Sequence, residues 1–222
     1  MIRIMIVDDQ SLIRDGLCSN LNRRKEIEVV DTAKDGEEAV QRAVESKPDL
    51  VLMDIRMPTV DGVEGMKLIK KHIPEIKVVM LTTFNDKEWI TEALEEGASG
   101  YLLKDMPTDA IVQAMMTVHQ GGIVLPQQFT QPMLEALRQR RVHNEKEASD
   151  IAQQMKQLTA RETEVLKELG LGKNNREIAD ALVITEGTVK NHISNVIQKL
   201  ELRDRTQAAV LAIRSGLVTF PT

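Results

Sequence analysis

The chain has 222 residues and a formal net charge of −5, with 42% hydrophobic and 28% charged residues. This length fits one large domain or two small ones, and the balance is that of a globular protein with a real core. The longest apolar run, residues 208–213, is far shorter than the ~20 residues of a membrane span. The first residues do not resemble a signal peptide, and the single cysteine excludes an intrachain disulfide. We therefore expect a cytoplasmic protein with no membrane partner.

Charge is distributed unevenly along the chain. Residues 1–121 carry 15 Lys+Arg against 22 Asp+Glu, whereas residues 122–222 carry 14 against 12. An acidic half joined to a mildly basic half indicates that the two halves have different roles.

Short apolar runs alternate with segments of helical periodicity in the first half. Fully apolar short runs are typical of strands in a parallel sheet that is buried on both faces. The segments between them place apolar residues at helical spacing, as at Leu12, Ile13, Leu17 and Leu21. This alternation predicts an α/β domain over residues 1–121, with a five-stranded, doubly wound parallel sheet. The predicted strands are residues 2–7, 28–32, 50–53, 78–82 and 101–103.

Polar residues stand at the ends of four of these predicted strands. In an open α/β sheet the ligand site lies at the carboxyl ends of the strands. Topology is therefore expected to bring three carboxylates, a hydroxyl and an ammonium to one edge of the sheet. These groups belong to Asp8 and Asp9 after the first strand, Asp54 after the third, Thr82 at the end of the fourth and Lys104 after the fifth.

Such a set of groups suits phosphoryl chemistry. Clustered carboxylates repel one another, and Mg²⁺ relieves the repulsion by taking carboxylate, water and phosphate oxygens as ligands. A carboxylate beside Mg²⁺ can attack phosphorus and form an aspartyl-phosphate. Lys104 would then neutralise phosphoryl oxygens, and Thr82 would donate a hydrogen bond to one of them. Taken alone, Asp8 and Asp9 could be a turn or a helix-capping pair, but their occurrence with Asp54 and Lys104 favours a functional role.

These residues resemble the receiver domain of bacterial two-component response regulators. The match covers residues 1–121 and rests on Asp8-Asp9, Asp54 within Leu-Met-Asp-Ile-Arg-Met-Pro, Asp61-Gly62, Thr82 and Lys104. The resemblance implies that Asp54 is the phosphoacceptor and that Thr82 and Lys104 assist it. It also implies a Mg²⁺ site formed by Asp8, Asp9, Asp54 and the backbone carbonyl of Arg56.

A conformational switch is a further implication of this resemblance. Thr82 and Tyr101 would form the switch pair, although Tyr101 could instead be an ordinary packing residue. The sequence departs from the receiver pattern at Asp105, where many receivers have a proline after the lysine.

The second half has a different organisation. Residues 122–157 are predicted to form a partly helical linker, because residues 130–157 are polar and charged, and residues 158–217 have a compact helical pattern. Thr159 and Glu162 have the spacing of a capping box that opens a helix, and Thr185 caps a longer helix that runs to about Leu200. The short connection at residues 183–186 has the length of the turn in a helix-turn-helix.

The helix from Glu186 to about Leu200 has one apolar and one polar face. Apolar residues at 189, 193, 196 and 200 recur at helical spacing and form the predicted buried stripe. The opposite face lacks carboxylates, which suits a helix in the DNA major groove. An ordinary solvated helix surface is the alternative. The polar face consists of Gly187, Asn191, Ser194 and Gln198, with Lys190 on its flank.

This half resembles the LuxR-type helix-turn-helix. The match rests on Leu-Thr-Ala-Arg-Glu at 158–162, Asn-Arg-Glu-Ile-Ala at 175–179 and Thr-Val-Lys-Asn-His-Ile at 188–193. With the receiver, the chain is similar to the NarL/FixJ family, in a layout closest to Gram-positive cell-envelope-stress regulators such as VraR and LiaR. The resemblance implies that Lys190, Asn191 and Ser194 face DNA bases. It places Arg176, Thr185, Thr188, His192 and Lys199 near phosphates, although His192 fits a packed surface role equally well.

The combined resemblance implies a transcription regulator. A sensor histidine kinase would phosphorylate Asp54, and a phosphorylated homodimer would bind double-stranded promoter DNA, with RNA polymerase a further candidate partner. The alternative is an aspartyl-phosphate phosphatase or mutase. Such enzymes place a general acid two residues after the nucleophile, where this chain has Arg56, and this alternative leaves residues 158–217 unexplained. We therefore expect no enzyme activity beyond phosphorylation from a donor and slow autodephosphorylation.

Overall fold

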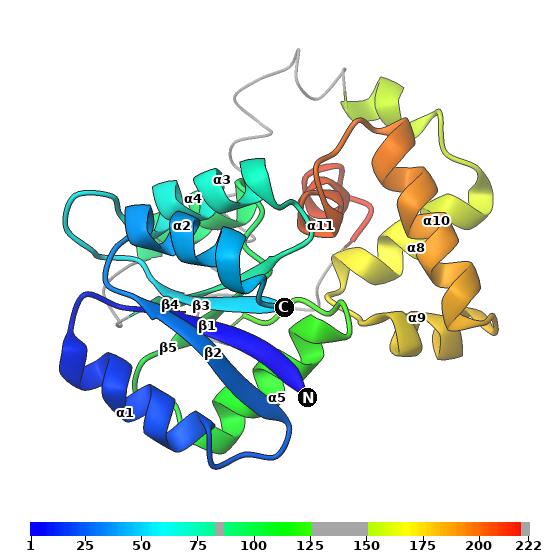
Figure 1. Cartoon of the computed structure of the whole chain (residues 1–222). Helices are drawn as coiled ribbons and strands as arrows, with labels where there is room; N and C mark the ends of the chain where they lie inside the picture. The colour runs from blue at the N-terminus through cyan, green and yellow to red at the C-terminus, as the bar shows by residue number, and fades with distance from the viewer. Residues whose placement is uncertain (83–86, 126–150, 219–222) are drawn as a thin grey trace. The chain divides into compact units, whose positions relative to one another are not determined.

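A computed structural model describes residues 1–82, 87–125 and 151–218. The chain divides into two compact units, Met1–His119 with Val124–Pro126, and Gln120–Ile123 with Gln127–Thr222. We call these the α/β unit and the helical unit (Figure 1). Most of the predicted linker, residues 122–157, falls on residues 126–150, which lie outside the described residues.

The α/β unit contains a five-stranded sheet in the order β2-β1-β3-β4-β5, and every neighbouring pair is parallel. This confirms the predicted fold class. The central strand β3 is buried along its whole length, as its uninterrupted apolar sequence requires in a sheet covered on both faces. The strands are β1 (Ile2–Val7), β2 (Ile27–Ala33), β3 (Leu50–Asp54), β4 (Lys77–Thr82) and β5 (Gly100–Leu103).

Helices cover both faces of this sheet. Helices α1 and α5 lie on one face and α2, α3 and α4 on the other (Figure 1). One apolar cluster joins the strands to α5, with Leu81, Leu102 and Met115 among its buried members. The helices are α1 (Ser11–Leu21), α2 (Gly36–Ser46), α3 (Gly62–His72), α4 (Lys87–Glu95) and α5 (Thr108–His119).

The start of α3 is packed tightly against the end of β3. The Asp61 side chain caps α3 by accepting a hydrogen bond from the Glu64 amide, and the Gly62 amide donates to the Ile55 carbonyl at 2.9 Å. A Cβ at Gly62 would lie 2.0 Å from the carbonyl oxygen of Asp54. Glycine is therefore required at this position because the helix approaches the backbone of the residue at the strand end.

The helical unit contains α8 (Ala160–Gly170), α9 (Asn175–Leu182), α10 (Glu186–Lys199) and α11 (Arg205–Arg214), and residues 151–155 are also helical. Thr159 and Glu162 form the predicted capping box of α8, and Thr185 caps α10 as expected. The predicted stripe at residues 189, 193, 196 and 200 is buried in the core of this unit. Within the described residues, no helix is both long and apolar enough to cross a bilayer.

The close approach at Gly62 generates a stability prediction. We expect Gly62→Ala to destabilise the α/β unit by about 3 kcal/mol, because the added methyl group must displace backbone atoms of β3. The only tryptophan, Trp89, lies in α4 of the same unit, so its fluorescence in a urea titration reports this unit. Gly16→Ala is the matched control, since a Cβ there meets no atom within 4 Å, and it should be neutral or slightly stabilising. An equal effect of the two substitutions would contradict the packing argument.

Candidate functional site

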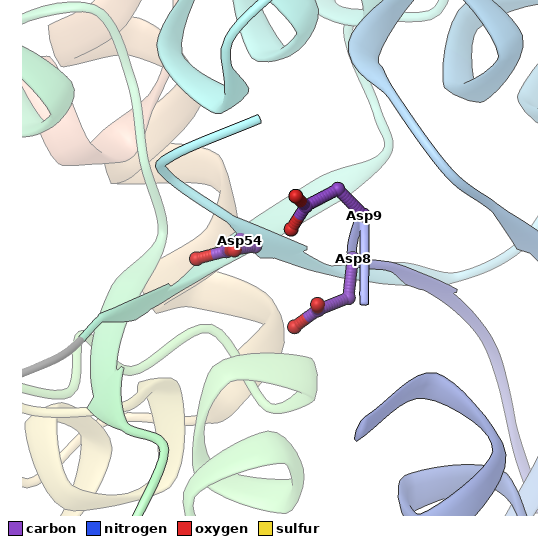
Figure 2. A group of neighbouring side chains, drawn as sticks. All are labelled: Asp8, Asp9 and Asp54. Carbon is purple, nitrogen blue, oxygen red and sulfur yellow. The ribbon is translucent and has the colours of Figure 1, made fainter. Parts of the chain in front are cut away.

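Three carboxylates meet at the carboxyl edge of the sheet. Strands β1 and β3 are neighbours, with Val7 opposite Met53, so the residues that follow or end them lie side by side. One carboxylate oxygen from each of Asp8, Asp9 and Asp54 lies within 4.8 Å of the others (Figure 2). Asp8 and Asp54 are buried, whereas Asp9 is exposed. The cluster therefore has two inner carboxylates and one that faces solvent.

Lys104 joins the two buried carboxylates. Its Nζ lies 2.8 Å from Asp8 Oδ2 and 2.7 Å from Asp54 Oδ2. The Lys104 amide donates to the carbonyl of Thr82 at 2.9 Å, which fixes the residue beside the end of β4. The structure thus brings together the four charged residues that the sequence placed at separate strand ends.

Two opposing effects set the pKa values of Asp54 and Lys104, namely burial and the attraction between their opposite charges. Burial raises the pKa of Asp54, and the ammonium of Lys104 only partly offsets that effect. Burial lowers the pKa of Lys104, but its hydrogen bonds to Asp54 and Asp8 outweigh burial, so that its pKa lies above the ordinary value. Lys104 is therefore a protonated counter-ion at neutral pH.

The donor set fits a hard divalent cation. Carboxylate oxygens are the ligands that Mg²⁺ prefers, and receiver domains bind this ion. Lys104 pairs with two of the three carboxylates, so a further cation would relieve the remaining repulsion. The Arg56 amide also donates a hydrogen bond to the Asp54 carboxylate, which places the backbone of Arg56 beside this cluster.

Thr82 and Tyr101 are both fully buried. Thr82 ends β4 opposite Leu103, and Tyr101 lies on β5 opposite Met80. The peptide between Lys104 and Asp105 is trans, as are the other described peptide bonds. Both residues proposed as a switch pair therefore lie inside the fold, on the two strands that adjoin Lys104.

The helical unit presents a polar surface on and around α10. Arg176, Thr185, Lys190, Asn191 and Ser194 are exposed, as are Gly187 and Gln198. Thr188 and His192 are half-buried. The Thr185 hydroxyl accepts a hydrogen bond from the Thr188 amide and lies 2.9 Å from the Thr188 hydroxyl. The Thr185 and Thr188 hydroxyls thus serve the start of α10, while Lys190, Asn191 and Ser194 face outward from the helix.

Lys199 has a partner inside the unit. Its Nζ donates to both carboxylate oxygens of Glu162, at 2.9 and 2.7 Å. Glu162 is buried and also closes the capping box of α8. Burial raises the pKa of Glu162, but the hydrogen bonds from Lys199 and Thr159 outweigh burial and hold it below the ordinary value. The pair ties the end of α10 to the start of α8.

Two interactions were not expected from the sequence. Arg14 donates from its guanidinium to the carbonyl of Asp8 at 2.6 Å, and Glu162 receives Lys199 from 37 positions away. Arg14 lies six residues after Asp8, but helical periodicity gave no reason to direct its side chain to a strand end. The capping spacing of Glu162 was visible in the sequence, whereas its distant cation was not.

Comparisons with known proteins match both halves of the chain. Residues 4–116 match the response regulator receiver domain, and residues 156–212 match the bacterial regulatory proteins of the luxR family. The transcriptional regulatory protein LnrK of Bacillus subtilis is 55% identical over 99% of this chain and 100% of its own. The chain is a response regulator of the NarL/FixJ family. The α/β unit contains its receiver domain, and the helical unit contains its LuxR-type DNA-binding domain.

Other relatives agree with this assignment. The transcriptional regulatory protein DegU of Brevibacillus brevis is 41% identical over 98% of this chain and 95% of its own. VraR of Staphylococcus aureus is 38% identical over 98% of this chain and 99% of its own. The VraR-like regulators named in the sequence analysis are therefore relatives, although LnrK and DegU are more similar. The crystal structure of the response regulator ChrA has a TM-score of 0.51 and 33% identity, and the match covers 98% of both chains.

A LuxR-family response regulator from Aurantimonas has a TM-score of 0.58 and 30% identity, with 61% of this chain and 97% of that one covered. The family consists of DNA-binding transcription regulators rather than enzymes, so the phosphatase or mutase alternative is set aside.

The ion pair of Lys199 generates a prediction about the DNA-binding domain. We expect Lys199→Met to destabilise this domain by about 1–2 kcal/mol, because Glu162 stays buried without its cation; the figure is below that for fully buried pairs, since Lys199 is 36% exposed. Lys190→Met is the control, since Lys190 is exposed. Thermal unfolding followed by far-UV circular dichroism measures both variants, and equal stabilities would contradict the role of the pair.

The lowered pKa of Glu162 adds a pH dependence. A carboxyl whose pKa is depressed on folding contributes stability above its unfolded pKa, and the contribution is lost as the pH falls through its folded pKa. Glu162 starts from an ordinary value of 4.5. We expect the stability advantage of the wild type over Lys199→Met to be present at pH 6 and to shrink below about pH 4.5. An advantage that stays constant from pH 6 to pH 3 would show that the charge of Glu162 is not its source.

Proposed function

We propose that this regulator is switched by phosphorylation of Asp54 by a sensor histidine kinase. The proposal rests on one observation, the convergence of Asp8, Asp9, Asp54 and Lys104 at the carboxyl edge of the sheet. Asp54 is the acceptor because it ends the buried central strand and its carboxylate lies within reach of both Asp9 and the ammonium of Lys104. Its carboxylate oxygen would attack the phosphorus of the kinase's phosphohistidine, and the P–N bond would break as the kinase histidine leaves. The proposed receiver spans residues 1–121, the linker 122–157 and the DNA-binding domain 158–217.

Asp8, Asp9, Asp54 and the carbonyl of Arg56 would hold Mg²⁺. The ion would neutralise negative charge between the acceptor and the arriving phosphoryl group. Lys104 would keep its ammonium at the site and move its contact from the Asp54 carboxylate to a phosphoryl oxygen. Thr82, buried at the end of β4, would donate its hydroxyl to another phosphoryl oxygen. Autodephosphorylation would be slow, since the site offers no general acid two residues after Asp54, where Arg56 stands.

The switch would pass through the two strands next to Lys104. A shift of Thr82 toward the phosphoryl group changes the space beside it, and Tyr101 on β5 would repack accordingly. Phosphorylation then shifts a pre-existing equilibrium toward a homodimer. The dimer would act in the cytoplasm on promoter DNA, with RNA polymerase as a further partner.

In the DNA complex α10 would lie in the major groove. Its buried stripe leaves Lys190, Asn191 and Ser194 facing outward, and such side chains reach base edges. Arg176, Thr185, Thr188 and His192 would approach phosphates. Lys199, at the end of α10, would also approach a phosphate, but its ion pair with Glu162 would compete with that contact. One helix reads few base pairs, so a dimer on two half-sites is expected.

The phosphoacceptor assignment is tested with a small-molecule phosphodonor. With acetyl phosphate and Mg²⁺, intact-mass spectrometry should show one added phosphoryl group per chain, and Asp54→Ala should show none. Asp105→Ala is the control, since Asp105 is an exposed carboxylate close to the same edge, and it should be labelled like the wild type. Equal labelling of Asp54→Ala and the wild type would overturn the assignment.

The DNA interface is tested by comparing a base-facing and a phosphate-facing residue. Asn191→Ala should cost ~1–3 kcal/mol on the matched duplex and relax the preference at one base position. Arg176→Ala should weaken matched and scrambled duplexes alike and flatten the salt dependence by the loss of one phosphate contact. Fluorescence anisotropy at two salt concentrations measures both. Equal losses of Asn191→Ala on the two duplexes would move this residue from the bases to the backbone.

A further inference from the structure

The side chain of Arg14 reaches the metal-ligand end of β1 from the first turn of α1. In helices long side chains lean toward the N-terminus, and here this direction carries the guanidinium back to the connection between β1 and α1. It donates to the backbone carbonyl of Asp8 at 2.6 Å. Arg14 is half-buried, so part of its donor set faces away from solvent.

The carbonyl that Arg14 contacts belongs to the peptide between Asp8 and Asp9. Because a peptide is planar, fixing its oxygen also fixes the direction in which the chain continues to Asp9. The other groups of Asp8 are held separately. Its amide donates to Ala33, its Oδ1 accepts from the Gln10 amide at 3.0 Å, and its Oδ2 lies 2.8 Å from Lys104. The carbonyl contact of Arg14 is therefore the interaction that bears on how Asp9 is presented.

Helix stability does not explain this arginine. A cation in the first turn opposes the helix dipole, whose N-terminus is positive. Gln10, at the N-cap, makes no side-chain capping hydrogen bond, and no acidic residue occupies the first turn of α1. The negative charge at this helix end comes from the Asp8 carboxylate just before the helix, which accepts from the Gln10 amide, and not from a residue in the first turn. The contact of Arg14 with Asp8 is the interaction that accounts for its placement.

We propose that Arg14 is a positioning residue for the Mg²⁺ ligands, which acts by holding the Asp8–Asp9 peptide in the orientation that turns both carboxylates toward Asp54. This inference rests on the proposed function of Asp8, Asp9 and Asp54 as Mg²⁺ ligands. Without Arg14 the Asp8–Asp9 peptide has more conformational freedom. Mg²⁺ binding must then order this peptide, which weakens the affinity for the ion. The charge of Arg14 acts in the opposite direction, because a nearby cation repels Mg²⁺, so a test has to separate orientation from charge.

The test measures Mg²⁺ binding to the full chain without phosphodonor by isothermal titration calorimetry, together with the Mg²⁺ dependence of Asp54 labelling by acetyl phosphate, both at 1 M KCl. The screening length is then about 3 Å, which suppresses the effect of charge but not that of a hydrogen bond. Arg14→Met should raise the half-saturating Mg²⁺ concentration about tenfold, the lower end of the range for groups that orient metal ligands. The labelling rate at saturating Mg²⁺ should stay within about twofold of the wild type, because the bound ion then holds the ligands in place even without Arg14.

Arg14→Lys should restore the half-saturating concentration, since an ammonium can donate to the same carbonyl. Arg23→Met is the charge-matched control and should behave as the wild type, because Arg23 is an exposed residue beyond the end of α1. Trp89 fluorescence in urea verifies that each receiver is folded. If Arg14→Met does not fold, Arg14→Leu takes its place with the same expectation, because leucine also lacks a hydrogen-bond donor.

An unchanged or lower half-saturating Mg²⁺ concentration in the folded Arg14 variant would overturn this inference. So would a fall in the saturated rate alone, which would place Arg14 on the phosphodonor instead. Both results leave the proposed function intact, provided that wild-type labelling needs Mg²⁺ and is lost in Asp54→Ala. If wild-type labelling needs no Mg²⁺, or persists in Asp54→Ala, the proposed function fails and this inference fails with it.

Discussion

Negative charge gathered at one edge of the sheet is the constraint on which the receiver depends. Asp8 and Asp54 are buried side by side, and an unpaired buried charge costs several kcal/mol. Lys104 offsets this cost from the end of β5. One ammonium thus links the ends of three strands. A phosphoryl group on Asp54 would draw on the same ammonium, so the contact that stabilises the resting site is the one that modification must rearrange.

Another buried carboxylate, Glu162, organises the DNA-binding domain in a different way. Glu162 closes the capping box of α8 and receives Lys199 from the end of α10. The pair fixes how α10 lies against α8, while the buried stripe of α10 decides which face points outward. In the receiver, Asp8 and Asp54 share Lys104 and lie beside a third carboxylate, Asp9, whereas Glu162 has its hydrogen bonds satisfied within the domain. The carboxylate cluster of the receiver suits a phosphoryl-transfer reaction. The Glu162–Lys199 pair suits a rigid DNA-binding surface.

Much of the site followed from the sequence, because the rules involved are local or topological. Short Val- and Ile-rich runs predict buried parallel strands, and strand ends in such a sheet meet at one edge. Asp8, Asp54 and Lys104 could therefore be placed together before any coordinates. Capping pairs such as Thr159 and Glu162 are equally local, since they depend on a spacing of three residues. The contacts of Arg14 and Lys199 were missed because a long, flexible side chain has several polar groups within reach.

The sequence by itself determined the strand and helix pattern, the family and the set of charged residues at the carboxyl edge, because periodicity and chain order encode them. Only the tertiary structure decided which of those charges pair. Lys104 could have faced solvent, and it instead lies between Asp8 and Asp54. Lys199, which the family resemblance placed near DNA phosphates, also contacts Glu162, a partner 37 positions away in the chain. Pairing depends on burial and on distances between segments far apart in the chain, and neither is a property of local sequence.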